Sequence, residues 1–164
     1  PLTFKYLLPA LKVVDAVFPR REQGRELADF AFTASLLSLG RLITKRMGYP
    51  TVNYWIARDT KTNQIYGTVG LYTHADDPEA YWGGWMCVDP RHRGRSIGKK
   101  LYEFALTEAK RKGDRPYFRF YTSTDPNEAR AQEMYDRSGF KVYKEEFDPV
   151  SGYTRLYRQG RLLE

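Results

Sequence analysis

The stretch that most constrains the fold covers residues 82–112. It contains an apolar run, Trp85–Val88, which is typical of a buried strand. Asp89-Pro90 ends this strand because proline has no N–H to donate to a neighbouring strand. A turn of small and cationic residues follows at 93–98, and apolar residues then recur at helical spacing over 97–109. The pattern predicts a strand, a basic turn and an amphipathic helix in direct succession.

This arrangement favours the binding of a phosphate group. The first N–H groups of a helix have no partners inside the helix, and the helix dipole favours an anion at that end. The predicted turn consists of Arg93, Gly94, Arg95, Ser96, Ile97 and Gly98. We therefore predict a phosphate-binding turn between the strand and the helix.

The distribution of positive charge supports this interpretation. The chain has a formal net charge of +7, which is compatible with nucleic acid, a membrane surface or an anionic cofactor as partner. Five of the cations fall within ten residues of the predicted turn: Arg91, Arg93, Arg95, Lys99 and Lys100. Because they concentrate at one turn and no aromatic RNA-binding motif accompanies them, we expect an anionic cofactor. Nucleic-acid binding remains the alternative.

Length and composition indicate one globular domain spanning residues 1–164. A chain of 164 residues with 41% hydrophobic and 29% charged content can bury a single core. Cys87 is the only cysteine, so no internal disulfide can form and we expect a reducing, cytoplasmic setting. No apolar run approaches the ~18 residues of a membrane span, and no signal peptide is evident. We therefore expect no association with a membrane.

The remaining elements follow from hydrophobic periodicity and turn residues. In chain order we predict a strand at 3–8, a helix at 10–18, a helix at 20–45 that is whole or broken near Gly40, strands at 52–58, 64–72 and 82–88, the helix after the turn, a strand at 117–123, a helix at 125–138, and strands at 140–144 and 153–158, with loops at 74–80 and 145–152. The order β-α-α-β-β-β-α-β-α-β-β predicts a mixed sheet in a single α/β (α+β) domain.

The two strands that flank the central helix are predicted to be parallel. A helix between strands 82–88 and 117–123 makes a β-α-β crossover, which connects parallel strands. Such a pair is expected to splay beyond the crossover and leave a cleft. Ligands of open α/β sheets bind at the carboxyl ends of the strands, so we expect the site there.

A second motif lies on the helix after this cleft. Asn127, Ala131 and Tyr135 are spaced four apart and would share one face of a helix. An amide, a small residue and a phenol along one face suit a narrow apolar ligand. The alternative is a stripe that faces the core, in which Tyr135 packs with Met134 and Phe140.

These two motifs carry a family resemblance. The string VDPRHRGRSIGKKL, followed by NEARAQEMYDRSGF, resembles the GNAT superfamily of acetyl-CoA-dependent N-acetyltransferases. The resemblance extends over residues 4–158 and is most specific over 82–140. It implies the single-domain acyl-CoA N-acyltransferase (GNAT) fold, acetyl-CoA as co-substrate, no metal, and direct transfer of an acetyl group to a primary amine in a ternary complex.

The resemblance also implies roles for particular residues. Met86, Cys87 and Val88 would offer backbone groups to the pantetheine arm and the thioester carbonyl. The pyrophosphate would be wrapped by Arg93, Gly94, Arg95, Ser96, Ile97, Gly98 and Lys99. Asn127 would bind the pantetheine, and Tyr135 would act as the catalytic acid that protonates the leaving thiolate.

Three positions depart from the family pattern. Ser96 stands where glycine is usual, and we expect it to be tolerated because serine is small and can cap a helix. Asn127 lies eight residues before Tyr135, where seven is common. Trp82 occupies the position at which many members carry a glutamate as general base.

The sequence therefore does not determine which group is the general base or which amine is the acceptor. Candidates for the base are Glu79, Asp77, His74 and a bound water. The acceptor is a small-molecule or peptide amine. Acidic residues near 76–79 and 145–148 suggest a cationic one, with ordinary surface charge as the alternative. A CoA-binding module without catalysis is a further alternative, and a homodimer is compatible with the family.

Overall fold

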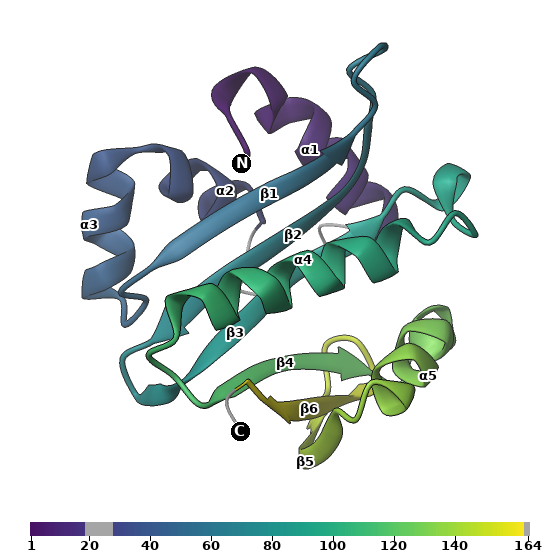
Figure 1. Ribbon diagram of the computed structural model, residues 1–164. Coiled ribbons are helices and arrows are strands. Elements are labelled where there is room, and N and C mark those ends of the chain that lie inside the picture. The colour runs from purple at the N-terminus through teal and green to yellow at the C-terminus, as the bar shows by residue number, and fades with distance from the viewer. Residues whose placement is uncertain (19–27, 163–164) are drawn as a thin grey trace.

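The computed structural model describes residues 1–18 and 28–162 (Figure 1). Its described strands form one six-stranded mixed sheet in the order β1-β2-β3-β4-β6-β5. Their bounds are Val52–Arg58 for β1, Ile65–His74 for β2, Asp77–Val88 for β3, Tyr117–Ser123 for β4, Lys141–Asp148 for β5 and Tyr153–Arg161 for β6. This is the mixed sheet of a single α/β domain, as predicted.

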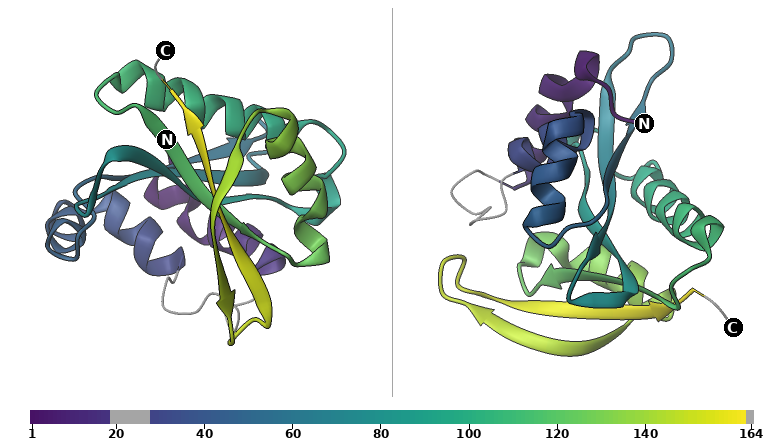
Figure 2. Two further views of the ribbon diagram at one scale, coloured as in Figure 1. Left: turned by 90° about the horizontal axis from the view of Figure 1, so that it is seen from below. Right: turned by 90° about the vertical axis from the view of Figure 1, so that its left-hand side faces the viewer.

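Helices cover both faces of the sheet. They are α1 at Phe4–Val17, α2 at Ala28–Leu36, α3 at Ser38–Arg46, α4 at Ile97–Lys112 and α5 at Ala129–Arg137, with short 3-10 turns η2 at Pro90–His92 and η3 at Pro126–Glu128. Figure 2 shows α1, α2 and α3 on one face of the sheet and α4 on the other. None of the helices among the described residues is long and apolar enough to cross a membrane.

The predicted first strand at 3–8 is wrong. These residues begin α1, which continues through Pro9, so the observed order opens with three helices. Pro9 favours the end of a strand at residue 8 because proline cannot donate to a ladder, and inside a helix it costs a hydrogen bond. In α1 that loss is offset by burial of Ala10, Val13 and Val14 against the sheet. Only Leu2 bonds to β1, donating its N–H to Tyr54 O at 2.8 Å.

The helix predicted at 20–45 is divided differently from expected. Residues 19–27 lie outside the described part of the chain, and the rest forms α2 and α3 with a break at Leu37, not at Gly40. Gly40 instead lies inside α3 and faces Ala34, and a Cβ atom there would meet Ala34 Cα at 2.5 Å. The missing side chain of Gly40 therefore lets α2 and α3 approach closely. In the sequence alone, a glycine inside a helical pattern suggests a break in the helix instead.

The strands are longer than predicted where two loops were expected. β3 begins at Asp77, so the predicted loop 74–80 shrinks to a two-residue turn between β2 and β3. β5 continues to Asp148, so most of the loop predicted at 145–152 belongs to that strand. Both regions are polar because they lie at exposed ends of hairpins. Their backbones still pair with the neighbouring strand, since strand formation depends on context as well as on residue type.

The parallel pair of β3 and β4 is confirmed, and it is short. Its pairs are Ala80 with Tyr117, Tyr81 with Phe118, and Trp82 with Arg119. Beyond Trp82 no described residue of β3 pairs with β4, and Figure 1 shows the two strands diverging toward their carboxyl ends. The predicted splay is therefore present, between the turn that precedes α4 and the helix α5.

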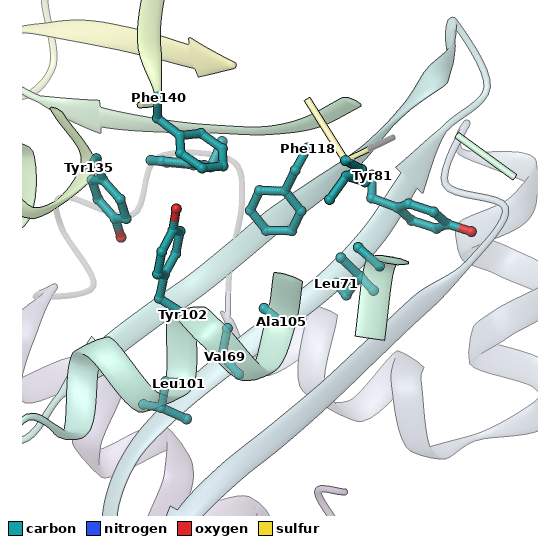
Figure 3. Close-up of a cluster of buried hydrophobic side chains, with 12 residues drawn as sticks. Val69, Leu71, Tyr81, Leu101, Tyr102, Ala105, Phe118, Tyr135 and Phe140 are labelled. Atoms are coloured by element: carbon teal, nitrogen blue, oxygen red, sulfur yellow. The ribbon is translucent and has the colours of Figure 1, made fainter. Parts of the chain in front are cut away.

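An aromatic core joins the two sides of this divergence. Figure 3 shows Tyr102 of α4 between Tyr135 of α5 and Phe118 of β4. The ring of Tyr135 lies 5.4 Å from that of Tyr102 and 4.3 Å from that of Phe120, measured between ring centroids. Aromatic pairs at these distances stabilise a core beyond their buried area, so these rings hold α4, α5 and β4 together where β3 and β4 separate.

Candidate active site

β3 is irregular just after it leaves β4. On β2, Thr68 and Gly70 are two positions apart, while their partners on β3, Cys87 and Gly84, are three apart. The extra residue makes a bulge, which interrupts the ladder and bends the strand. Trp85 within it has a φ of +44°, a conformation that bulky side chains rarely adopt.

The predicted binding residues of β3 lie at this bulge and beyond it. Met86 and Val88 are half-buried, and Cys87 is buried. Burial raises the pKa of the Cys87 thiol to about 11, so the thiol stays protonated at neutral pH. Cys87 is therefore a small core residue and not an activated nucleophile.

Asp89 fixes the chain as it leaves β3. Its buried carboxylate accepts hydrogen bonds from the N–H, Nε and Nη2 of Arg91 at 2.9, 3.1 and 2.7 Å, and its own N–H donates to Tyr66 O at 2.8 Å. The hydrogen bonds from Arg91 lower the pKa of Asp89 to about 2. The apolar pattern of β3 predicts Asp89 only as a strand end, although aspartate before proline is also a recognisable turn signal.

The predicted phosphate-binding turn has the geometry of an anion site. Gly94 and Ser96 both have left-handed backbone conformations, with φ of +79° and +56°. Within the described part of the chain, no backbone N–H from residue 94 to residue 99 is bonded to a protein acceptor. Successive free N–H groups in such a turn form a concavity for anions. Arg93, Arg95, Ile97, Gly98 and Lys99 all belong to this segment, and their binding of a pyrophosphate stays a prediction.

Ser96 plays a different part from the one expected. It occupies the N-cap position of α4, but its side chain makes no capping hydrogen bond. The positive φ explains why glycine is usual at this position in the family, because glycine adopts that conformation without strain. The serine hydroxyl is left available to a ligand.

Tyr135 reaches the opening from α5. Its hydroxyl lies 3.6 Å from Met86 Sδ on β3, across the divergence of the two strands. Burial raises the pKa of Tyr135 above its usual value, and the carboxylate of Glu128 raises it further. The phenol is therefore protonated at neutral pH. Tyr135 also packs in the core, as the alternative interpretation of the sequence expected, and its role toward a ligand stays a prediction.

Asn127 does not share a helix face with Tyr135 in the way predicted. It lies in η3, a 3-10 turn, and α5 begins only at Ala129. A 3-10 helix has three residues per turn, whereas the predicted shared face assumed the α-helical spacing of four. Asn127 therefore does not lie on the same face of α5 as Ala131 and Tyr135. Its N–H donates to Asp125 Oδ1 at 2.8 Å, and the residue is exposed beside the end of β4.

Glu128 is a carboxylate whose position the sequence did not predict. It accepts from the N–H of Ser123 at 3.1 Å and from the hydroxyl of Ser123 at 2.7 Å. Burial raises its pKa. It thereby ties the end of β4 to the turn before α5, next to Tyr135.

Arg158 anchors the other end of α5. The side chain is buried on β6, and its Nη1 donates to Asp136 Oδ1 at 2.5 Å and to Phe140 O at 3.2 Å. Its Nε donates to Thr122 Oγ1 of β4 at 3.3 Å. A cation at a helix C-terminus is favourable. No sequence pattern predicted this residue, because a strand arginine is ordinarily exposed.

Two of the three candidate bases are remote from the opening. Asp77 lies nine residues before Met86 and Glu79 seven, which corresponds to ~30 and ~23 Å along an extended strand. His74 is packed against the rings of Tyr49 and Trp82, at 4.6 and 5.3 Å between centroids. None of these side chains adjoins Tyr135 or the bulge.

The acidic segments are paired with the protein's own cations. Asp77 bonds to Arg119 at 2.6 Å, Glu146 to Lys144 at 2.9 Å, and Asp148 to Arg155 at 3.3 Å. These pairs reduce the negative field that the two segments offer to solvent. The described part of the chain also holds no group of three His, Cys, Asp or Glu residues arranged as metal ligands.

Comparison with known proteins identifies the family. A family model described as "Acetyltransferase (GNAT) domain" matches residues 50–142, which is more than half of the 164-residue chain. The chain therefore belongs to the GNAT family of acetyltransferases. The match includes β3, the phosphate-binding turn and α5. No curated protein matches the chain.

Solved structures share the fold over most of the chain. A protein described as an acetyltransferase of the GNAT family from Desulfovibrio desulfuricans has a TM-score of 0.75 at 16% identity, covering 98% of this chain and 94% of that one. A chain in the NatC complex bound to Gag peptide and CoA gives 0.72 at 19%, covering 98% and 92%. A protein described as a streptothricin acetyltransferase from Bacillus anthracis, in complex with acetyl coenzyme A, gives 0.56 at 23%, covering 68% and 63%.

Proposed function

We propose that this protein is an N-acetyltransferase that transfers the acetyl group of acetyl-CoA directly to a primary amine. The observation that carries the proposal is the position of Tyr135. Its protonated hydroxyl lies 3.6 Å from Met86 where β3 and β4 diverge. The same strand leads directly into a turn with free N–H groups. One ligand that carries a diphosphate at one end and a thioester at the other would engage both features.

Acetyl-CoA fits the residues present. The free N–H groups from residue 94 to 99, with Arg93, Arg95 and Lys99, would hold the pyrophosphate. The backbone of Met86, Cys87 and Val88 borders the space that the pantetheine arm would occupy. Asn127 lies in the turn before α5, and its amide would bind the arm.

The transfer itself needs few groups. The neutral amine nitrogen attacks the thioester carbon, and the carbonyl π electrons move to oxygen. Backbone N–H groups of the bulge, from Met86 or Val88, would stabilise that oxyanion. Collapse of the intermediate breaks the C–S bond, and Tyr135 gives its proton to the departing sulfur. The surplus proton of the amine leaves through bound water, and Tyr135 regains a proton from solvent. Glu128, the carboxylate beside Tyr135, is held by the N–H and hydroxyl of Ser123 and is not assigned as the base.

Direct attack is favoured over a covalent intermediate on Cys87. The pKa of that thiol is raised to about 11, and a buried protonated thiol is a poor nucleophile. A ternary complex of protein, acetyl-CoA and amine therefore accounts for the site without an acetyl-enzyme.

The acceptor is a small-molecule or peptide amine. The similar fold is used by a protein described as a streptothricin acetyltransferase and by a complex bound to a Gag peptide, so the fold accommodates both kinds. Asp77, Glu146 and Asp148 are paired with cations of the protein, so attraction of a cationic acceptor would depend on Asp76, Glu79 and Glu145 in the same two segments.

A CoA-binding module without catalysis is the second candidate, and Trp82 in place of a strand carboxylate favours it. Calorimetry with CoA, followed by thiol release from acetyl-CoA with a panel of amines, separates the candidates. Binding with turnover above the hydrolysis background supports the transferase. Binding without turnover of any amine supports the module, and the absence of binding by folded protein contradicts both.

A further inference from the structure

The bulge of β3 is held in a costly conformation. Trp85 has a φ of +44°, and it is the bulkiest of the described non-glycine residues with a positive φ. The ladder between β3 and β2 is interrupted at this residue. A bulky side chain in this region costs of order 1–3 kcal/mol and persists only when its surroundings determine it. Some interaction must therefore hold this segment in place.

Thr68 of β2 makes that interaction. Its side chain is fully buried, at 0% exposure, and its hydroxyl donates to Trp85 O at 2.6 Å. The same hydroxyl lies 3.3 Å from Cys87 Sγ. Thr68 thus contacts the bulge on both sides of Met86.

This hydrogen bond fixes the direction of the next N–H group. In a trans peptide the C=O of one residue and the N–H of the next point in opposite directions. Trp85 O is turned toward Thr68 on β2, so the N–H of Met86 points away from β2. That is the side from which β4 has parted, and the Met86 side chain there contacts Tyr135.

We propose that Thr68 is a positioning residue for acetyl transfer. Its hydroxyl holds the Trp85–Met86 peptide so that the N–H of Met86 is aimed at the thioester carbonyl. A hydrogen bond received by the peptide oxygen also polarises the peptide and strengthens its N–H as a donor. This assignment rests on the proposed function, and it selects Met86 over Val88 as the donor to the oxyanion.

The test removes the hydroxyl and keeps the shape. Thr68→Val lacks the donor, Thr68→Ser keeps it, and Thr44→Val is the matched control. Thr44 is also a buried threonine whose hydroxyl donates to a backbone carbonyl, Arg41 O at 3.1 Å, but it lies in α3. Infrared difference spectra of acetyl-CoA labelled with 13C at the thioester carbonyl report the polarisation and need no acceptor.

We expect the carbonyl band of bound acetyl-CoA to shift to lower frequency in the wild type, Thr68→Ser and Thr44→Val, and to return toward its free position in Thr68→Val. Turnover by Thr68→Val should fall about 10- to 100-fold, with the KM for acetyl-CoA changed less than about threefold, because one oxyanion donor is misaimed. A folded Thr68→Val protein with the wild-type band and turnover would overturn the assignment.

A second measurement covers the case in which Thr68→Val does not fold. In the wild type, the amide proton resonance of Met86 should move downfield with acetyl-CoA and not with CoA, since only the former carries the carbonyl. Equal shifts with both would also overturn the assignment while leaving the proposed function intact. Failure of the wild type to bind acetyl-CoA would instead contradict the proposed function itself.

Discussion

At the scale of single residues, the site combines strain with burial. Trp85 and Ser96 both hold left-handed backbone conformations without being glycine, one at the bulge and one at the phosphate-binding turn. Tyr135 is buried among aromatic rings with its pKa raised. The two strained backbone conformations are unfavourable for folding alone, and they coincide with elements of the proposed chemistry, as the buried Tyr135 does.

Tyr135→Phe should separate binding from catalysis. The change removes the proton that the thiolate needs and leaves the ring packing, so kcat should fall ~10²–10³-fold while CoA affinity is retained. Because burial raises the pKa of Tyr135, the wild-type phenol stays protonated through its usual titration range near 10. The kcat of the wild type should therefore show no decline caused by Tyr135 up to about that pH. A kcat for the variant equal to that of the wild type across pH would remove Tyr135 from the role of acid.

Ser96→Gly should stabilise the protein by about 0.5–1 kcal/mol, because glycine relieves the positive φ. Urea unfolding measures the change, and CoA affinity should be kept. Gly94→Ala is the complementary variant: its Cβ would enter open space, so only backbone strain acts, and stability should fall by about 1 kcal/mol. If Ser96→Gly destabilised the protein, the assigned turn conformation would be wrong.

At the scale of elements, two side chains hold the pieces that carry the site. Asp89 holds the short turn η2, which leads into residues 93–98, at the end of β3, and Arg158 on β6 ties α5 to β4. Neither touches the position of a reacting atom. Both fix the ends of the elements between which the ligand is expected to lie.

Asp89→Asn should flatten the acid dependence of stability. A carboxyl whose pKa is lowered to about 2 in the folded protein contributes stability above the unfolded pKa of 3.8. That contribution is lost as the pH falls from about 4 to about 2, and it amounts to roughly 1–2 kcal/mol. Unfolding followed at pH 6, 4 and 2.5 should show this loss in the wild type and not in the variant. Parallel curves for the two proteins would contradict the assignment.

Arg158→Met should destabilise the protein by about 1–3 kcal/mol, since Phe140 O and Thr122 Oγ1 lose a buried donor. It should also lower kcat by loosening the helix that carries Tyr135. The control is Arg137→Met, which removes an exposed pair with Glu133 at 3.3 Å and should change neither quantity measurably. Equal effects from the two variants would show that Arg158 does not anchor α5.

At the scale of the whole molecule, two half-sheets meet along three residue pairs and then separate. A CoA molecule in the opening would touch both halves, whereas ADP would reach only the phosphate-binding turn. Hydrogen exchange should therefore slow in residues 93–99 with either ligand, and in β3 and α5 with CoA alone. Equal protection of α5 by the two ligands would place the pantetheine arm elsewhere.

The sequence was sufficient for the parts of this architecture that follow from local pattern. The strand, turn and helix over residues 82–112, the parallel strand at 117–123 and Tyr135 all carry strong periodicity or motif signals. The strand predicted before Pro9 is wrong because the burial of neighbouring residues in α1 outweighs the local cost of proline in a helix. Thr68 and Arg158 could not be assigned because their roles depend on partners brought close only by the fold, whereas Asp89 bonds to the nearby Arg91 and carries a local turn signal.

The division of the sheet in space is also a division of the chain. Strands β1, β2 and β3 come before Gly113, and β4, β5 and β6 come after Pro116. One surface loop therefore separates two contiguous sequence blocks, joined in the native state by three ladder pairs and the aromatic core. Such a chain is suited to cleavage within residues 113–116 and reassembly from two fragments. It is also suited to exchange of the C-terminal block between relatives, since recombination there would leave each half-sheet intact.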